Sequence, residues 1–218
     1  VKLASDATGE VVITVNGVDY HVAIENGVAS VTVSGLEAGD YTVAVKYAGD
    51  DNYNAAEVTK GVNVAKANPA LNVIIDSVDY GNVFTINAVL TGVNNAPLDT
   101  NIIVTVNGKN YIVAIVNGKG TFHADKLAAG SYNFNARFAG SNNYNEVSDS
   151  GKFNVYKVDS AIGITVKDIN VGEDAVITVK LFSDATGELT VTVNGKDYTA
   201  NVVNGRATVS VSDLKAGN

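Results

Sequence analysis

The chain has 218 residues, of which 46% are hydrophobic and 17% charged, so it carries enough apolar content to build hydrophobic cores. It contains no Cys, which excludes disulfides and thiolate chemistry, and no apolar run is long enough to predict a membrane span. A net charge of −8, with the acidic residues scattered, argues against nucleic acid and anionic membrane surfaces as partners.

Several phrases recur in a fixed order along the chain and define an internal repeat. Thr-Val-Asn-Gly occurs at residues 14–17, 105–108 and 192–195, so its Asn recurs after 91 and then 87 residues. YAGDDNYN, at Tyr47–Asn54, matches FAGSNNYN at Phe138–Asn145 in the same phase. The repeating unit is therefore about 90 residues long, and the chain holds about two and a half units.

This period predicts three parts in chain order. Residues 1–66 form a partial unit without its opening strands, residues 67–157 a complete unit, and residues 158–218 a partial unit without its closing strands. The phrase SDATGE, near both ends of the chain, marks the crossing from the second strand into the third. Both partial units are therefore expected to contain the third strand, its hairpin partner and the next strand. We expect the sequence to be a window cut from a longer repeat protein.

Seven short runs in residues 67–157 alternate apolar and polar residues. The expected strands are Ala70–Ile75, Val83–Leu90, Ile102–Val106, Tyr111–Val116, Gly120–Ala124, Tyr132–Phe138 and Lys152–Tyr156. Alternation over β-branched residues indicates strands with one buried face. Asn-Gly pairs separate some of these runs and favour type I′ hairpin turns. Nothing has a helical period, so we predict an all-β fold of tandem immunoglobulin-like antiparallel β-sandwich repeats.

Two Tyr residues follow tight Ala-Gly bends at corresponding places in the first two units. The phrases are LEAGDYTV and LAAGSYNF. A Tyr in this setting is typical of a tyrosine corner, in which the hydroxyl group bonds to backbone upstream. The residues expected to have this structural role are Tyr41 and Tyr132, together with Gly39 and Gly130 of the bends.

Three phrases carry a resemblance to a known family: VTVNGK followed closely by Tyr, LAAGSY, and YAGDDNYN. With these phrases the chain resembles the bacterial-type immunoglobulin-like repeats of large adhesin-like surface proteins, especially those of methanogenic archaea. The resemblance covers nearly the whole chain. It implies an extracellular, cell-anchored stalk of many domains, and it does not point to a particular ligand.

The links between units are short and contain no Gly/Ser tract that would act as a flexible joint. They read VNVAKANPALNV at Val62–Val73 and FNVYKVDSAIGI at Phe153–Ile164. Asn68-Pro69 favours an extended link, because the residue before Pro is pushed into the β region. We therefore expect stacked sandwiches in a rod-like array.

The loop AGDDNYN places four oxygen-bearing side chains close together: Asp50, Asp51, Asn52 and Asn54. They could serve as ligands for Ca²⁺, which takes about six to eight oxygens. The alternative is a tight turn, since Asn and Asp tolerate left-handed backbone and bond to their own main chain. The second copy has lost both acidic residues, whereas a structural calcium would be expected in both, so we favour the turn and predict no cofactor.

Three Tyr residues, Tyr20, Tyr111 and Tyr198, recur just after Asn-Gly turns. They could form a ladder of platforms for sugar rings, or they could pack across the hairpin and hold its register. Their presence in every unit favours packing. The two His residues, His21 and His123, lie in different units at strand positions expected to face solvent, without convergent catalytic partners.

No nucleophile motif is recognisable, so we predict that the chain is not an enzyme. The expected function is a structural or adhesive repeat segment of an extracellular, cell-surface stalk or filament, which spaces and supports a distal binding region. The expected partners are further repeats of the same chain or neighbouring copies, and cell-surface glycans or proteins. Two alternatives remain open: an array of carbohydrate-binding modules, and a filament subunit whose partial terminal units complete each other end to end.

Overall fold

The computed structural model describes residues 1–217, and the chain divides into two compact units, Val1–Tyr156 and Lys157–Asn218. Their regular structure is β-strand throughout, apart from one short 3₁₀ turn, η1 (Val93–Asn95). No helix in this part of the chain is long and apolar enough to cross a membrane. The Val1–Tyr156 unit contains two separate hydrophobic cores, and we call residues 1–66 the first repeat and residues 67–156 the second repeat.

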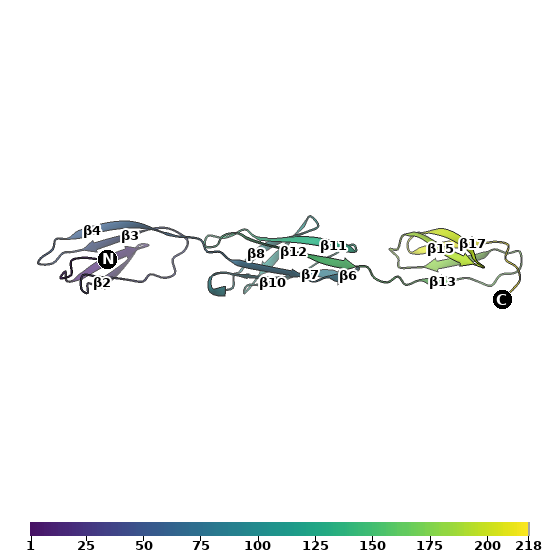
Figure 1. Ribbon diagram of the computed structural model, residues 1–218, viewed down its shortest axis with the longest axis horizontal. Coiled ribbons are helices and arrows are strands. Elements are labelled where there is room, and N and C mark those ends of the chain that lie inside the picture. The colour runs from purple at the N-terminus through teal and green to yellow at the C-terminus, as the bar shows by residue number, and fades with distance from the viewer. Residues whose placement is uncertain (218) are drawn as a thin grey trace. The chain divides into compact units, whose positions relative to one another are not determined.

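The second repeat is a β-sandwich of two facing sheets (Figure 1). Its strands are β5 (Ala70–Ile75), β6 (Val78–Asp79), β7 (Val83–Thr91), β8 (Thr100–Val106), β9 (Lys109–Ile115), β10 (Lys119–Lys126), β11 (Gly130–Phe138) and β12 (Val147–Tyr156). One sheet has the order β10-β7-β5 and the other β6-β12-β11-β8-β9. The seven predicted strands are all present, and the predicted all-β sandwich class is confirmed. The sequence pattern did not predict β6, which pairs in parallel with β12.

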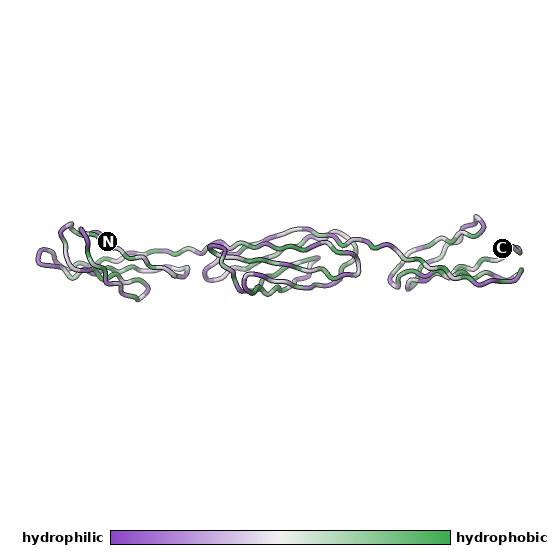
Figure 2. The backbone as a smooth tube through the Cα atoms, turned by 90° about the horizontal axis from the view of Figure 1, so that it is seen from below, coloured by the Kyte–Doolittle hydropathy of each residue, from purple (hydrophilic) through white to green (hydrophobic). Residues whose placement is uncertain are grey.

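Alternate side chains from both sheets fill one core. Figure 2 shows the matching alternation of hydrophobic and hydrophilic residues along the backbone. Phe84 on β7 is fully buried and joins the two sheets. Its ring centroid lies 5.1 Å from that of Phe153 on β12 and 5.7 Å from that of Tyr111 on β9. Truncating such an aromatic side chain to Ala typically costs about 3–5 kcal/mol, so this cluster is a main source of stability.

The predicted Asn-Gly turns form hairpins. Asn107 and Gly108, between β8 and β9, have φ angles of 49° and 76°. Positive φ at both central residues defines a type I′ turn, whose twist matches that of the flanking strands. Asn is among the few residues other than Gly that adopt this conformation readily, so the dipeptide specifies the turn locally.

The first repeat is a smaller assembly built on one sheet. Its strands are β1 (Glu10–Val15), β2 (Val18–Ala23), β3 (Gly39–Tyr47) and β4 (Ala56–Val64), in the order β2-β1-β3-β4. Val11, Ile13 and Val15 of β1 are buried with Tyr47 of β3. Partly buried residues of the following segment, including Val31 and Val33, pack against the same core.

One sequence prediction for the first repeat is wrong. The strand expected after the β1–β2 hairpin is not formed, and residues 29–37 have no regular strand pairing. The corresponding strand of the second repeat, β10, pairs with β7. The described first repeat has no counterpart of β7 over this stretch, so the segment has no ladder to join.

In the Lys157–Asn218 unit, by contrast, the strand expected after the hairpin is formed. Its strands are β13 (Gly163–Thr165), β14 (Ala175–Lys180), β15 (Gly187–Val193), β16 (Lys196–Val202) and β17 (Arg206–Val211). One sheet has the order β13-β14-β17, and β15 pairs with β16. The strand expected after the hairpin is present here as β17, because β14 supplies its ladder partner.

Candidate functional site

The predicted corner residues make the same hydrogen bond in both repeats. The hydroxyl group of Tyr132 donates to the carbonyl oxygen of Ala128 at 2.8 Å, and that of Tyr41 donates to the carbonyl oxygen of Glu37 at 2.9 Å. Gly39 and Gly130 lie between donor and acceptor in the chain. This geometry corresponds to a tyrosine corner, which fixes the bend that leads into β3 or β11.

Two loops at corresponding ends of the repeats are the best candidates for a functional site. We call residues 48–54 the first end loop and residues 139–145 the second end loop. The first end loop leads from β3 to β4 and the second from β11 to β12. Both loops have the recurring sequence AG-x-x-Asn-Tyr-Asn.

Asp50 organises the first end loop by accepting hydrogen bonds from backbone amides. Its Oδ1 accepts from the N–H groups of Asn52 and Tyr53, both at 2.9 Å. Its Oδ2 accepts from the N–H group of Thr8 at 2.9 Å and from the Thr8 hydroxyl at 3.1 Å. These bonds, the Thr8 amide first, hold the pKa of Asp50 well below its usual value.

Two Tyr hydroxyls, one in the loop and one at the end of β3, are bonded to the SDATGE phrase. Tyr53 donates to Oδ1 of Asp6 at 2.7 Å, and Tyr47 donates to the carbonyl oxygen of Thr8 at 3.1 Å. The repeated phrase therefore contains the residues that anchor an end loop. Sequence reasoning missed Asp6 and Thr8 in this role, and the repeats offered no signal for it, because SDATGE recurs in the Lys157–Asn218 unit whereas the loop phrase recurs in the second repeat.

The four candidate calcium ligands, Asp50, Asp51, Asn52 and Asn54, have different surroundings. Oδ1 of Asp50 accepts hydrogen bonds from the turn and Oδ2 accepts them from Thr8, while Asp51, Asn52 and Asn54 are exposed. Over residues 1–217, no group of three or more His, Asp or Glu side chains is placed to hold a metal ion.

In the second end loop Ser141 stands where the first has Asp50. Its hydroxyl oxygen accepts from the N–H groups of Asn143, at 3.3 Å, and Tyr144, at 3.2 Å. The feature that the two end loops share is thus a side-chain-capped turn.

The second end loop binds the link between the two repeats through the backbone. The N–H group of Ala67 donates to the carbonyl oxygen of Asn143, and the N–H group of Asn145 donates to the carbonyl oxygen of Ala67, both at 2.9 Å. Ala67 and Tyr144 thereby form a short parallel β-bridge. The link is consequently held on the second repeat at its midpoint.

Side chains reinforce this junction on both sides of Ala67. Lys66 Nζ donates to the carbonyl oxygen of Ser141 at 2.7 Å, and Nδ2 of Asn145 donates to Oδ1 of Asn68 at 2.7 Å. The N–H group of Ala38, at the tyrosine-corner bend of the first repeat, donates to Oδ1 of Asn143 at 2.9 Å. Asn143 therefore connects the body of the first repeat directly to the second.

The structure places Tyr111 in the core, which removes the central member of the proposed sugar platform. Tyr111 is 5% exposed, its ring packs against Phe84 and Phe122, and its hydroxyl donates to Oδ2 of Asp125 at 3.0 Å. Burial, together with Asp125, raises the pKa of Tyr111 to about 12. Tyr20 and Tyr198 are half-buried against their own cores. The three residues therefore pack the hairpins.

The two His residues are exposed and lie in different repeats. Nδ1 of His21 lies 2.8 Å from Oε1 of Glu10, and this hydrogen bond raises the pKa of His21 above its ordinary value of 6.5. Nδ1 of His123 lies 3.0 Å from the hydroxyl oxygen of Thr85. Each His thus belongs to a local cross-strand pair.

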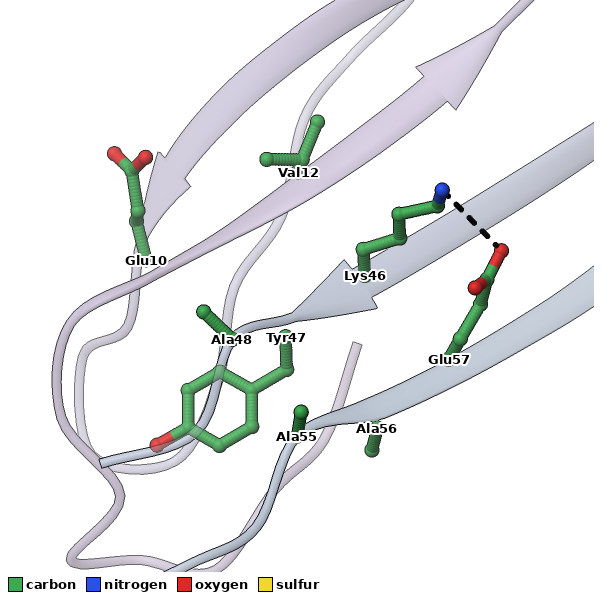
Figure 3. A pocket seen from close by; sticks show the side chains of 8 residues that line it. All are labelled: Glu10, Val12, Lys46, Tyr47, Ala48, Ala55, Ala56 and Glu57. Carbon is green, nitrogen blue, oxygen red and sulfur yellow. Dashed lines mark ion pairs between the residues drawn. The ribbon is translucent and has the colours of Figure 1, made fainter. Parts of the chain in front are cut away.

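A hollow of about 440 Å³ opens on the outer face of the first repeat (Figure 3). It exists because Ala48, Ala55 and Ala56 are small, and Figure 3 shows Lys46 and Glu57 extending toward each other beside it. Lys46 Nζ lies 3.7 Å from Oε1 of Glu57, and the lining residue Glu10 pairs with His21. The charges around this hollow compensate one another, so it offers no charge that would select a ligand.

No family model matches the chain, and no curated protein matches it. Among solved structures, 48 chains are similar. Dimeric latent PorU from Porphyromonas gingivalis has 10% identity and a TM-score of 0.30, over 98% of this chain and 27% of that one. Chicken CNTN1 domains FN1–FN3 have 12% identity and a TM-score of 0.29, over 99% and 81% of the chains.

A third similar structure is the Escherichia coli alpha-2-macroglobulin activated by porcine elastase. It has 9% identity and a TM-score of 0.29, over 99% of this chain and 27% of that one. The chain thus spans about a quarter of the PorU and macroglobulin chains. Similarity at this level assigns no activity to the chain.

Proposed function

We propose that the chain is a structural or adhesive repeat segment of an extracellular, cell-surface stalk or filament that spaces and supports a distal binding region. The bonded junction at residues 66–68 carries this proposal. A link that is hydrogen-bonded to the next repeat at Ala67, and bridged by Asn143 to the preceding bend, restricts pivoting between repeats. The resemblance to immunoglobulin-like repeats of adhesin-like surface proteins supports the same function.

The second repeat also has a connection suited to tension. The chain enters this repeat through β5 and β6 and leaves it through β12, and β6 pairs in parallel with β12 at Val78 and Val155. The N–H group of Tyr80 donates to the carbonyl oxygen of Tyr156 at 2.8 Å, and that of Asn154 donates to the Ser77 hydroxyl at 2.9 Å. Pulling parallel strands from opposite ends loads their hydrogen bonds together, so they resist better than bonds broken one at a time.

The restricted junction can be tested with paired spin labels, because the chain has no Cys of its own. Labels at Thr59→Cys on β4 and Thr121→Cys on β10 report the distance between the two repeats. We expect a narrow distance distribution that broadens in Asn143→Ala and stays narrow in Asn142→Ala, a matched exposed position in the same loop. A distribution equally broad in all three proteins would contradict a restricted junction.

The cellular part of the proposal has a separate test. Antibodies raised against the chain should label intact cells of the natural source, and immunogold electron microscopy should place the label away from the envelope. Labelling that appears only after the cells are lysed would exclude a surface stalk.

A further inference from the structure

Each of the three repeating units carries two Asn-Gly turns of the same local conformation. The first turn joins β1 to β2, β8 to β9, or β15 to β16, and we call these the tip turns: Asn16-Gly17, Asn107-Gly108 and Asn194-Gly195. The second follows β2, β9 or β16, and we call these the anchored turns: Asn26-Gly27, Asn117-Gly118 and Asn204-Gly205. Both residues have positive φ in all six pairs, so the backbone conformation does not distinguish the two sets.

The two sets differ in the surroundings of the glycine. Gly108 is exposed, and among the described residues, its chain neighbours apart, no atom lies within 4 Å of the position that a Cβ atom would take there. Gly118 is buried, and a Cβ atom there would come within 2.9 Å of Pro97. The carbonyl oxygen of Gly118 accepts a hydrogen bond from the N–H group of Leu90 at 2.9 Å. The tip turn is therefore free to move, whereas the anchored turn is held against a neighbouring segment.

The same difference recurs in the other two units. Gly27 and Gly205 are buried, and their carbonyl oxygens accept from the N–H groups of Leu3 and Leu181, both at 2.8 Å. The tip-turn glycines of these units are exposed. The contrast is thus a property of the repeat and not of one hairpin.

An Asn-Gly pair can react with itself, and Asn is among the thermally labile residues of proteins. The main-chain nitrogen of the glycine loses its proton to hydroxide and attacks Cγ of the Asn side chain. A C–N bond forms, the side-chain nitrogen takes a proton from water and leaves as ammonia, and a succinimide ring closes. Water then opens the ring at either carbonyl group, which gives aspartate or isoaspartate. Glycine has no side chain to hinder the attack.

The type I′ conformation opposes ring closure. It turns the glycine nitrogen away from the Cβ atom of Asn, so the ring closes only after the Asn–Gly peptide has rotated out of the turn geometry. At Asn107 this rotation displaces exposed atoms at the tip of a hairpin. The reaction therefore reports how easily each turn opens.

Opening is more costly at Asn117, although its side chain is exposed as well. It displaces the carbonyl group of Gly118 from Leu90, and it disturbs a second bond, in which Oδ1 of Asp99 accepts from the N–H group of Asn117 at 2.6 Å. Each such bond changes the population of the open turn by about two- to tenfold.

We propose that the tip turns are modification sites, at which Asn16, Asn107 and Asn194 lose ammonia through a succinimide, while the anchored turns retain their Asn. Each unit then carries one reactive and one protected copy of the same dipeptide. The isoaspartate product adds one atom to the main chain and one negative charge. Because the length of a turn fixes the register of its hairpin, modification of Asn107 loosens the pairing of β8 with β9 next to the turn.

The second repeat contains a matched pair for the test, because the tetrapeptide Val-Asn-Gly-Lys surrounds both Asn107 and Asn117. The full chain is incubated in mildly alkaline buffer and cleaved after Lys109 and Lys119, which places the two Asn in different peptides. Mass spectrometry follows the replacement of the amide by a carboxyl group, and electron-transfer fragmentation identifies isoaspartate. We expect Asn107 to convert at least about tenfold faster than Asn117, at a rate that increases with hydroxide concentration.

Two controls show whether the fold causes the difference. In denaturant the two Asn should convert at rates within about twofold of each other, because their neighbours in the chain are the same. Asp99→Ala should accelerate conversion of Asn117 about two- to tenfold and leave Asn107 unchanged. Asp76→Ala, which removes another exposed carboxylate of the same repeat, should change neither rate.

Three results would overturn the proposal. The first is equal conversion of Asn107 and Asn117 in the folded chain. The second is an intact Asn107 after a time in which the unfolded chain has converted fully, since the turn itself would then protect both sites. The third is an unchanged rate at Asn117 in Asp99→Ala, which would show that the bonds of the anchored turn do not protect it.

Discussion

The first and second repeats place corresponding residues in different environments. Phe153 of β12 is 2% exposed, while Val62, at the same position of β4, is 44% exposed. The strands that carry them have the same register with their neighbours: Tyr132 faces Phe153, and Tyr41 faces Val62. The difference is the β10-β7-β5 sheet, which covers Phe153 and has no described counterpart over Val62.

This comparison shows that alternation in the sequence defines which face of a strand can be buried, but not whether it is buried. Val31 and Val33 alternate as clearly as Phe122 and Ala124 do, yet only the latter pair belongs to a strand. Regular pairing requires a partner strand from elsewhere in the sequence.

The largest expected difference between the repeats comes from truncating the side chain of Phe153 or of its counterpart, Val62. Phe153→Ala removes an aromatic ring from a closed core and should lower the free energy of unfolding of the second repeat by about 3–5 kcal/mol. Val62→Ala should cost less than about 1 kcal/mol, because its side chain is already largely solvated. Hydrogen exchange, followed separately for β12 and β4 amides, measures the two effects. Equal losses would show that the first repeat is closed in solution.

A second expected difference concerns Gly151, which lies opposite Phe134. A Cβ atom at Gly151 would come within 2.7 Å of the Phe134 ring, so Gly151→Ala should destabilise the second repeat by about 1–3 kcal/mol. The first repeat has Lys60 here, opposite the smaller Val43. Gly151→Ala should lower the free energy of unfolding less in a Phe134→Val background than in the natural sequence, because the smaller side chain leaves room for the added methyl group. Chemical denaturation of the set checks this coupling, and strict additivity would contradict it.

The end loops should respond differently to acid. The folded pKa of Asp50 lies below its ordinary value near 3.8, so its contribution to stability is complete above that value and is lost as the pH falls toward the folded pKa. Amide exchange in the first end loop should therefore accelerate below about pH 4, and Asp50→Ser should remove most of this dependence. The second end loop, capped by Ser141, is the internal control. Equal acid sensitivity of both loops would argue against the Asp50 clamp.

The smallest expected effect is at the outer face of the first repeat. Glu10→Gln should lower the pKa of His21 toward its ordinary value of 6.5, because Glu10 is the main cause of its elevation. The stabilisation from this pair is complete below the ordinary pKa and is lost as the pH rises through the folded one. NMR titration of the His21 ring protons in both proteins measures the shift. An unchanged titration would exclude the pair in solution.

The sequence predicted the strands of the second repeat well, because Asn-Gly turns and period-two alternation are local signals. It missed β6, whose two residues are too few to show a period, and the first half of β12, where VSDSG has little apolar content. The end-loop turn was recognisable because Asp and Asn are typical turn residues. The junction could not be predicted, because Ala67 bonds to Asn143 and Asn145, more than about 75 positions away, through backbone groups. Nearly every residue type has these groups, so the sequence does not indicate which residues use them.

The Asn-Gly turns also have a consequence for the order of folding. Neighbouring repeats of similar sequence are prone to exchange strands during folding, since each strand would fit its counterpart's place. Hairpins with a type I′ turn close within about 1–10 μs, before distant segments can meet. β1–β2, β8–β9 and β15–β16 are each joined by such a turn, so each repeat can establish its own register first. The repeated turn thus favours correct pairing within each repeat while the chain is still largely unfolded.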